Sequence, residues 1–240
     1  MNSVKLSERM QVIASMVLPG LPVADIGTDH GFIPAYLLAE GICPHAVLTD
    51  VNRGPLEKCK ANLKELGIDP ALYDIRLGNG FEPLEAGEVS TVIIAGMGGE
   101  LIQSMFEAYP FAAESAEEGP GLFERAVLQP RTHADDLRGY LTQSGFKICA
   151  YRLARERGRI CEVFAVEHCS PAMLKADTGL VSSYLLEHGD PLLAEFVDGK
   201  IARTRAVLES LENSTLTEST QQRAIYNALT EQLLEIRKNI

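Results

Sequence analysis

The sequence predicts an α/β fold, with a mostly parallel sheet first and a helical segment at the C-terminus. Short apolar runs alternate with segments of helical periodicity up to about residue 145, a pattern typical of parallel strands joined by helices. Two runs rich in β-branched and aromatic residues, 146–153 and 160–166, then indicate an antiparallel hairpin. After residue 180 the strand pattern ends. These three observations define the fold class.

Each predicted strand is a short apolar run that ends at a glycine or a polar turn. The five runs of this kind lie at residues 21–26, 45–50, 72–77, 91–95 and 125–129. The predicted helices repeat apolar residues every three to four positions and stop at glycine or proline. They lie at residues 3–18, 33–40, 55–66, 99–107 and 133–144. Residues 110–121 are small and acidic, with glycine and proline among them, and are interpreted as a surface loop.

The C-terminal segment is predicted to form two long helices, at 192–211 and 220–237, each with one apolar stripe. A turn at Asn213–Thr215 joins them, so an antiparallel helical hairpin, similar to a coiled coil, is the simplest interpretation. Gly199 argues against an unbroken first helix. We therefore expect two domains, a sheet domain and a helical domain, at residues 1–168 and 169–240.

Composition and charge argue against several classes of protein. The formal net charge is −11, whereas nucleic-acid binders usually carry excess positive charge, so RNA binding would depend on local patches. No apolar run approaches the roughly 18–20 residues of a membrane span, and the polar N-terminus lacks a signal-peptide pattern. The five cysteines are scattered without Cys-x-x-Cys, which argues against disulfides and structural zinc. We expect a cytoplasmic protein without a metal, monomeric or weakly dimeric.

The segment Asp25-Ile26-Gly27-Thr28-Asp29-His30-Gly31 follows a predicted strand and opens a helix. A glycine at such a turn lets the backbone approach a ligand, and the start of a helix adds N–H donors. The spacing is Gly-x-x-x-Gly rather than the Gly-x-Gly-x-x-Gly of dinucleotide-binding proteins. An acid before the first glycine suits the amino group of a methionine moiety. Asp25 and Gly27 therefore predict binding of S-adenosylmethionine, and a strand–helix turn without a ligand is the alternative.

Two further segments complete the predicted nucleoside site. Asp50 ends the second strand, 23 residues after Gly27, where a carboxylate accepts hydrogen bonds from both ribose hydroxyls. Asp50 and the following Val51 are assigned to the cofactor. Gly78-Asn79-Gly80 follows the third strand, and the Asn79 amide offers a donor and an acceptor to an adenine edge. The alternatives are a turn cap for Asp50 and a plain Asn-Gly turn for the second segment.

Gly96-Met97-Gly98-Gly99 follows the fourth strand. Three glycines in four positions make room for a flat substrate beside the methyl donor. Gly96 and Met97 are assigned to the cofactor, and Gly98 and Gly99 to the substrate. Enzymes that methylate exocyclic amines usually carry Asn/Asp-Pro-Pro-aromatic at this point, and its absence argues against amine methylation. A purely structural glycine turn is the alternative.

Taken together, these residues resemble the bacterial tRNA (adenine(22)-N(1))-methyltransferase family, TrmK. The matching segments, within the first two thirds of the chain, are Leu6–Arg9, Val23–His30, Arg76–Gly80, Ile94–Gly99 and Leu128–Pro130. The Asp29-His30 pair and the Gly96–Gly99 segment are the most specific parts. The chain departs from the family by having Asp50 in place of glutamate, Arg131 in place of asparagine and Gly31 in place of alanine. The resemblance implies a Rossmann-like class I methyltransferase fold with a mostly parallel seven-stranded sheet, S-adenosylmethionine as cofactor and tRNA as partner.

The resemblance also implies that adenine N1 attacks the sulfonium methyl group in line. N1 already carries a lone pair, so positioning and charge stabilisation are the main catalytic tasks. Asp29 is the candidate for stabilising the methylated ring and His30 is the next candidate, while a helix N-cap is the alternative for Asp29. The arginines assigned to RNA phosphates are Arg9, Arg131, Arg152 and Arg155. A solvated strand edge is the alternative for the last two.

Other functions stay open at this point. The acidic net charge favours a methyltransferase that acts on a small molecule. A non-catalytic RNA-binding protein with a vestigial nucleoside pocket is a second alternative, although the intact Asp25, Gly27 and Asp50 argue against decay. The glycine spacing disfavours a nicotinamide-dependent dehydrogenase.

Overall fold

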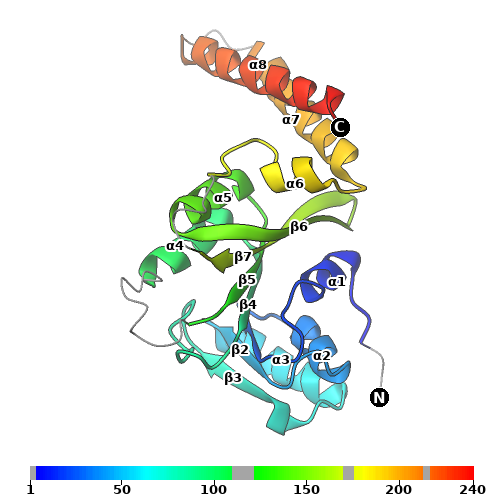
Figure 1. Cartoon of the computed structure of the whole chain (residues 1–240), viewed down its shortest axis with the longest axis vertical. Helices are drawn as coiled ribbons and strands as arrows, with labels where there is room; N and C mark the ends of the chain where they lie inside the picture. The colour runs from blue at the N-terminus through cyan, green and yellow to red at the C-terminus, as the bar shows by residue number, and fades with distance from the viewer. Residues whose placement is uncertain (1–3, 110–121, 170–175, 213–216) are drawn as a thin grey trace. The chain divides into compact units, whose positions relative to one another are not determined.

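A seven-stranded sheet forms the centre of the first part of the chain (Figure 1). The computed structural model describes residues 4–109, 122–169, 176–212 and 217–240. The strands are β1 (Val23–Ile26), β2 (Ala46–Asp50), β3 (Tyr73–Leu77), β4 (Thr91–Met97), β5 (Arg125–Pro130), β6 (Phe146–Glu156) and β7 (Arg159–His168). Their order is β3-β2-β1-β4-β5-β7-β6, with β1 to β5 parallel and β7 antiparallel to both neighbours. The predicted Rossmann-like methyltransferase fold is confirmed.

Helices cover both faces of this sheet. They are α1 (Glu8–Ala14), α2 (Phe32–Ala39), α3 (Arg53–Glu65), α4 (Gly99–Ala108) and α5 (Ala134–Gln143), with a 3₁₀ turn, η1 (Pro70–Leu72), before β3. α1, α2 and α3 share one core with the sheet, in which Ile13, Leu37 and Leu63 are fully buried. α4 and α5 lie together on the other side (Figure 1). Since both faces are covered, the strand ends and their loops are left for ligands.

The first helix is shorter than its apolar pattern predicts. α1 begins at Glu8 because the Ser7 side chain accepts a hydrogen bond from the Met10 N–H and caps the helix. The helix ends at Ala14, so the predicted span of 3–18 is wrong at both ends. Met16 and Val17 are buried although they lie outside the helix. A buried turn therefore extends the apolar repeat beyond the helix itself.

The predicted antiparallel hairpin is confirmed, and its strands are longer than the sequence indicates. β6 and β7 pair up to Glu156 and Arg159. The two residues between them, Arg157 and Gly158, have φ angles of 48° and 75°. Two positive φ values in a two-residue loop match the right-handed twist of the flanking strands.

A buried polar network joins α5 to this hairpin. Arg138 is fully buried and donates from Nη1 to the Tyr151 hydroxyl (3.1 Å) and to Glu162 Oε1 (3.2 Å). The Tyr151 hydroxyl in turn donates to Glu162 Oε1 (2.6 Å). The carboxylate of Asp177 lies 3.7 Å from Arg138 Nε. The guanidinium is thus surrounded by groups that depend on its charge.

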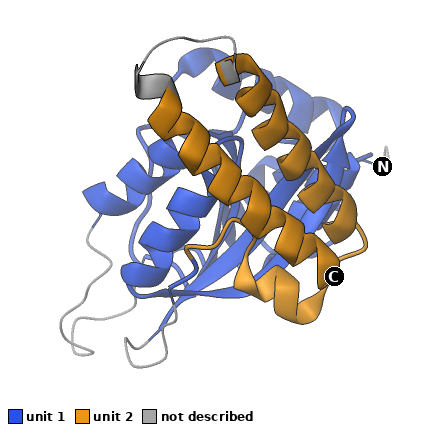
Figure 2. Ribbon diagram, turned by 90° about the horizontal axis from the view of Figure 1, so that it is seen from above, with its two compact units in different colours: residues 1–177 blue, residues 178–240 orange. Residues whose placement is uncertain are grey.

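The chain separates into two compact units, residues 1–177 and 178–240, coloured differently in Figure 2. The second unit contains α6 (Ser183–His188), α7 (Leu193–Glu212) and α8 (Thr217–Lys238). The assignment of separate domains at 1–168 and 169–240 stays a prediction. The predicted loop at 110–121 and the turn at 213–215 lie outside the described residues.

The helices α7 and α8 pack against each other in antiparallel fashion, as predicted. The Thr230 hydroxyl donates to the Thr204 hydroxyl (3.0 Å), and Arg237 Nε donates to Asp198 Oδ1 (2.8 Å). α7 continues unbroken through Gly199, which faces open space, so the expected interruption is wrong. None of the described helices combines the length and apolar composition that a membrane crossing needs.

Candidate active site

The carboxyl ends of the parallel strands bring the predicted cofactor residues to one edge of the sheet. Ile26 of β1 lies opposite Thr49 of β2 and Ile94 of β4, and Asp50 lies opposite Leu77 of β3. The loops after these strands therefore meet. The predicted residues placed at this edge are Asp25, Gly27, Asp29, His30, Asp50, Val51, Gly78, Asn79, Gly80, Gly96, Met97, Gly98, Gly99 and Arg131.

Asp25 lies within β1 and is buried. Burial raises the pKa of Asp25 to about 6, because the charged carboxylate loses its hydration. The hydroxyl of Thr28 is buried beside the carboxylate and lowers the pKa of Asp25 slightly through a weak interaction. It makes no hydrogen bond of normal geometry with any described residue. Such groups are costly to bury unless a partner satisfies them. The pair therefore fits a positively charged ligand group that donates hydrogen bonds.

Gly27 links the first loop to the end of β4. Its φ angle is +72°, and a Cβ at this position would lie 1.9 Å from the terminal methyl carbon of Met97. The N–H groups of Gly27 and Thr28 both donate to the Thr49 carbonyl, at 2.8 and 2.9 Å. These two donors are therefore used within the protein, and the buried side chains of Asp25 and Thr28 keep capacity for a ligand.

The end of β2 combines a carboxylate with apolar surface. Asp50 Oδ1 accepts a hydrogen bond from the Asn52 N–H (2.7 Å), and the Asp50 carbonyl accepts one from Gly78 (3.1 Å). Val51 is 57% exposed and Leu77 is 50% exposed. Large apolar side chains with this exposure offer a surface on which a planar ring can lie. The carboxylate beside them retains acceptor capacity for hydroxyl groups.

Contacts within the protein account for the glycines of the loop after β3. A Cβ on Gly78 would lie 2.4 Å from Pro83 Cγ, and Gly80 has a φ of +52°. The exposed Asn79 accepts a hydrogen bond from the Glu82 N–H through its carbonyl (3.0 Å). The Asn79 side chain is thus held at the rim on a tight turn.

The three glycines at the end of β4 differ in how much space surrounds them. Gly96 has a φ of +79° and open space around its α-carbon. A Cβ on Gly98 would be in ordinary contact with the Thr132 hydroxyl, at 3.4 Å. A Cβ on Gly99 would lie 2.6 and 2.5 Å from the carbonyl oxygens of Thr132 and His133. The glycine at Gly99 is therefore required by the protein's own backbone, and its assignment to the substrate stays a prediction.

Asp29 lies in the loop between β1 and α2, where its side chain is 65% exposed. Its Oδ2 is 3.2 Å from His30 Nε2, and its Oδ1 is 4.0 Å from Lys58 Nζ on α3. The residue that occupies the N-cap position of α2 is Gly31, so Asp29 does not serve as that cap. Lys58 was missed from the sequence, because only the packing of α3 beside this loop brings it near Asp29.

The predicted RNA-binding arginines have unequal surroundings. Arg9 forms an ion pair with Glu156 and donates to Gln129 Oε1 (2.9 Å), and its side chain is 15% exposed. Arg131 is exposed, and its backbone N–H donates a hydrogen bond to the Met97 carbonyl (2.7 Å). Arg152 and Arg155 are exposed on the edge strand β6. Arg9 thus holds α1 to the sheet edge, and its contact with RNA stays a prediction.

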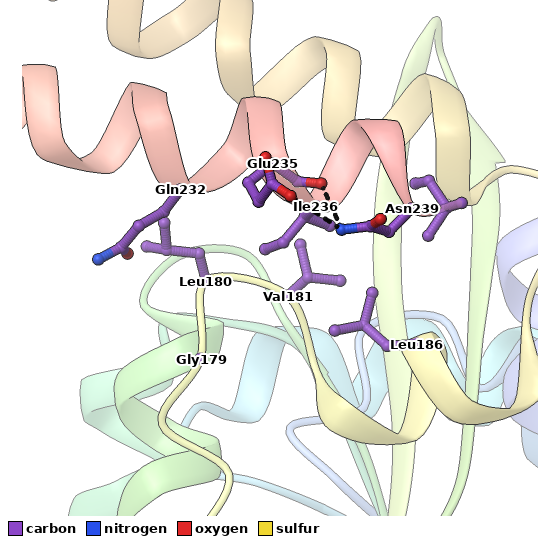
Figure 3. Close-up of a pocket in the computed structure, with 9 residues that line it drawn as sticks. Gly179, Leu180, Val181, Leu186, Gln232, Glu235, Ile236 and Asn239 are labelled. Carbon is purple, nitrogen blue, oxygen red and sulfur yellow. Dashed lines mark hydrogen bonds between the residues drawn. The ribbon is translucent and has the colours of Figure 1, made fainter.

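A separate pocket of about 580 Å³ lies within the second unit (Figure 3). Leu180, Val181, Leu186 and Ile236 give it an apolar lining, and Asn239 donates to the Glu235 carbonyl at its rim (2.9 Å). It lacks the paired carboxylates and glycine turns of the sheet edge. Across the described ranges, no group of three or more His, Cys, Asp or Glu side chains is placed to hold a metal ion.

The fold and this edge define a methyltransferase of the Rossmann-like class, since β7 lies antiparallel between β5 and β6 and the acidic residues stand at the ends of β1 and β2. The chain belongs to the methyltransferase domain family, whose family model matches residues 6–164.

Similarity to known proteins extends over nearly the whole chain. The tRNA (adenine(22)-N(1))-methyltransferase of Bacillus subtilis (strain 168) is 27% identical over 228 residues, covering 93% of this chain and 92% of the relative. The crystal structure of the B. subtilis m1A22 tRNA methyltransferase TrmK is 25% identical, with a TM-score of 0.81 over 98% of this chain and 99% of that one. Streptococcus pneumoniae Sp1610 in complex with S-adenosyl-L-methionine is 27% identical, with a TM-score of 0.80 over 97% and 100% of the two chains.

Proposed function

We propose that this chain transfers the methyl group of S-adenosylmethionine to N1 of adenine 22 in tRNA, the reaction named for its B. subtilis relative. One combined observation carries the proposal: the chain is similar to that enzyme over 93% of its length, and its candidate cofactor and catalytic residues lie at one edge of the sheet. Buried Asp25, terminal Asp50 and the exposed carboxylate of Asp29 surround the same sheet edge. The proposal includes a cytoplasmic location and a monomer or weak homodimer.

The residues at this edge fit the proposed cofactor. S-adenosylmethionine supplies an electrophilic methyl group on a sulfonium. Asp25, with the unsatisfied Thr28 hydroxyl beside it, provides the acceptors for the ammonium group. Asp50 provides acceptors for the ribose hydroxyls, while Val51 and the Asn79 amide serve the adenine ring. Gly96, with its open surroundings, leaves the space next to the reacting group free.

The chain's contribution to the reaction is positioning and charge stabilisation. The adenine N1 lone pair forms the new bond to carbon while the carbon–sulfur bond breaks, so no base has to activate N1. The methylated ring is cationic unless its exocyclic amine loses a proton. The exposed Asp29 carboxylate stabilises either product form. His30, 3.2 Å from that carboxylate, orients it.

RNA contacts are proposed along the same edge of the sheet. Arg131 follows β5, and its backbone N–H donates to the Met97 carbonyl (2.7 Å) at the end of β4. Arg152 and Arg155 stand on β6, which runs parallel to β5 two strands away, or about 10 Å at the usual strand spacing. These arginines provide local positive charge in a chain whose net charge is −11. The target adenine has to leave its stack to reach the methyl group.

The test is methyl transfer from labelled S-adenosylmethionine to tRNA transcripts, followed by mass spectrometry of the nucleosides. We expect N1-methyladenosine with wild-type transcripts and none when adenine 22 is replaced by guanine. Incorporation that ignores this replacement would overturn the assigned position. Cofactor binding without transfer to any tRNA would instead favour a small-molecule substrate, and absence of cofactor binding would favour a vestigial pocket.

A further inference from the structure

An exposed aromatic pair lies beside the candidate catalytic carboxylate. The rings of His30 and Phe32 are stacked, with centroids 5.5 Å apart and an interplanar angle of 19°. Phe32, the first residue of α2, is 38% exposed, and the His30 side chain is 45% exposed. An exposed phenylalanine beside a reacting group provides a face on which a nucleobase can stack.

The pair is held in place from α3. Asn62 Nδ2 donates to the His30 carbonyl (3.1 Å) and lies 3.4 Å from His30 Nδ1. On the other side of the ring, Asp29 Oδ2 lies 3.2 Å from His30 Nε2. The imidazole is therefore fixed by contacts on both nitrogens. A platform whose orientation is already set loses little conformational entropy when a base stacks on it.

A cation stands next to this platform. Lys58 Nζ is 4.0 Å from Asp29 Oδ1, and its side chain is 62% exposed. The α3 sequence from 53 to 65 has four basic residues, Arg53, Lys58, Lys60 and Lys64, and two acidic ones, Glu57 and Glu65. This helix is therefore locally positive in a chain of net charge −11. Local positive charge attracts an RNA strand and neutralises its phosphates.

We infer that His30, Phe32, Lys58 and Asn62 form a nucleotide subsite, in which an unpaired base of the RNA substrate stacks on Phe32 and its phosphate lies at Lys58. The inference rests on the proposed function, because it assigns the RNA of that reaction to one surface. His30 and Lys58 contact Asp29 directly, and Phe32 and Asn62 contact it through His30. The subsite thus holds the RNA strand beside the reacting groups.

The experiment measures tRNA binding by fluorescence anisotropy without cofactor, and cofactor binding by calorimetry. Phe32→Leu should weaken tRNA binding about 5- to 150-fold, the range for loss of one stacked base, while Phe32→Tyr should bind tRNA as wild type does. Lys58→Ala should make the slope of log affinity against log salt less negative by about 0.7 to 0.9, and Lys58→Arg should not. Cofactor affinity should change less than twofold in every variant.

Lys147→Ala is the matched control, because Lys147 is exposed at the start of β6, at the opposite edge of the sheet. Equal tRNA affinity in Phe32→Leu and wild type, or an equal loss in the Lys147 variant, would overturn the subsite. If wild type binds tRNA but transfers no methyl group to it, the proposed function fails while the binding comparison still decides the subsite. A thermal melt of each variant separates loss of folding from loss of binding.

Discussion

The terminal methyl carbon of Met97 lies 1.9 Å from the position that a Cβ atom would take on Gly27. Two segments that are far apart in the sequence, the turn after β1 and the end of β4, therefore pack as one unit. Gly27 is required for two separate reasons, since its φ of +72° also disfavours a side chain.

Gly27→Ala should lower the free energy of unfolding by about 2–5 kcal/mol, as the sum of left-handed backbone strain and overpacking. Urea denaturation measures the change. In the double variant Gly27→Ala/Met97→Ala the methyl contact is absent but the strain remains. The double variant should thus be more stable than the two single losses predict, by at least about 1 kcal/mol. Strict additivity would show that the contact is not a source of strain.

Affinity for S-adenosylmethionine should depend on pH through Asp25. Its pKa is raised to about 6 by burial, and an ammonium group pairs with the carboxylate rather than with the neutral acid. The dissociation constant should therefore rise about tenfold for each pH unit below 6 and level off above it. Calorimetry between pH 5 and 8 measures this. Asp25→Asn should bind weakly at every pH, whereas the control Asp50→Asn should bind weakly but keep the pH dependence.

The free energy of unfolding of the ligand-free protein should decrease as the pH rises, whereas affinity for S-adenosylmethionine should increase. Because folding raises the pKa of Asp25 from 3.8 to about 6, its favourable contribution is complete below about pH 4 and is lost as the pH rises through 6. The shift corresponds to about 3 kcal/mol. Asp25→Asn should therefore be more stable than wild type at pH 7.5, by up to this amount. An advantage that is the same at pH 7.5 and pH 5 would contradict the assignment.

Asp29→Asn should lower kcat for tRNA methylation by about 10²- to 10⁴-fold, the usual range for one positioned acid–base group. Its side chain is 65% exposed, so stability and cofactor affinity should stay near wild type. Single-turnover transfer of labelled methyl groups measures the effect. Glu65→Gln, an exposed carboxylate at the far end of α3, is the control. Full turnover in Asp29→Asn would remove this residue from the mechanism.

Arg138→Met should destabilise the protein by about 3–5 kcal/mol, the cost of removing one partner from a buried ion pair. The variant leaves Glu162 and Asp177 without the guanidinium that faces them. Thermal and urea unfolding measure the loss. Lys147→Met, at an exposed position, should change stability by less than about 0.5 kcal/mol. A similar effect in both variants would mean that the buried network contributes nothing specific.

Local patterns predicted the fold and the meeting of the candidate-site loops, because the parallel strands β1 to β5 place their carboxyl ends at one edge. They did not predict partners brought together by tertiary packing. Arg9 reads as a free cation in the sequence, yet Glu156, 147 positions away, pairs with it. Lys58 and Asn62 belong to the Asp29–His30 cluster only because α3 lies beside that loop. The six-residue α6 was missed because it is too short for a periodic pattern.

The irregular end of β4 limits which mutations the protein can tolerate. The pairing of β4 with β5 shifts between Ala95 and Met97, so that Gly96 is an extra residue in the strand. Deleting Gly96 would restore regular pairing but would remove the left-handed residue, with its φ of +79°, and the bend that this residue gives the end of β4 where Met97 packs on Gly27. The segment is therefore constrained in its length as well as in its composition, and point substitutions should persist in descendants where single-codon deletions do not.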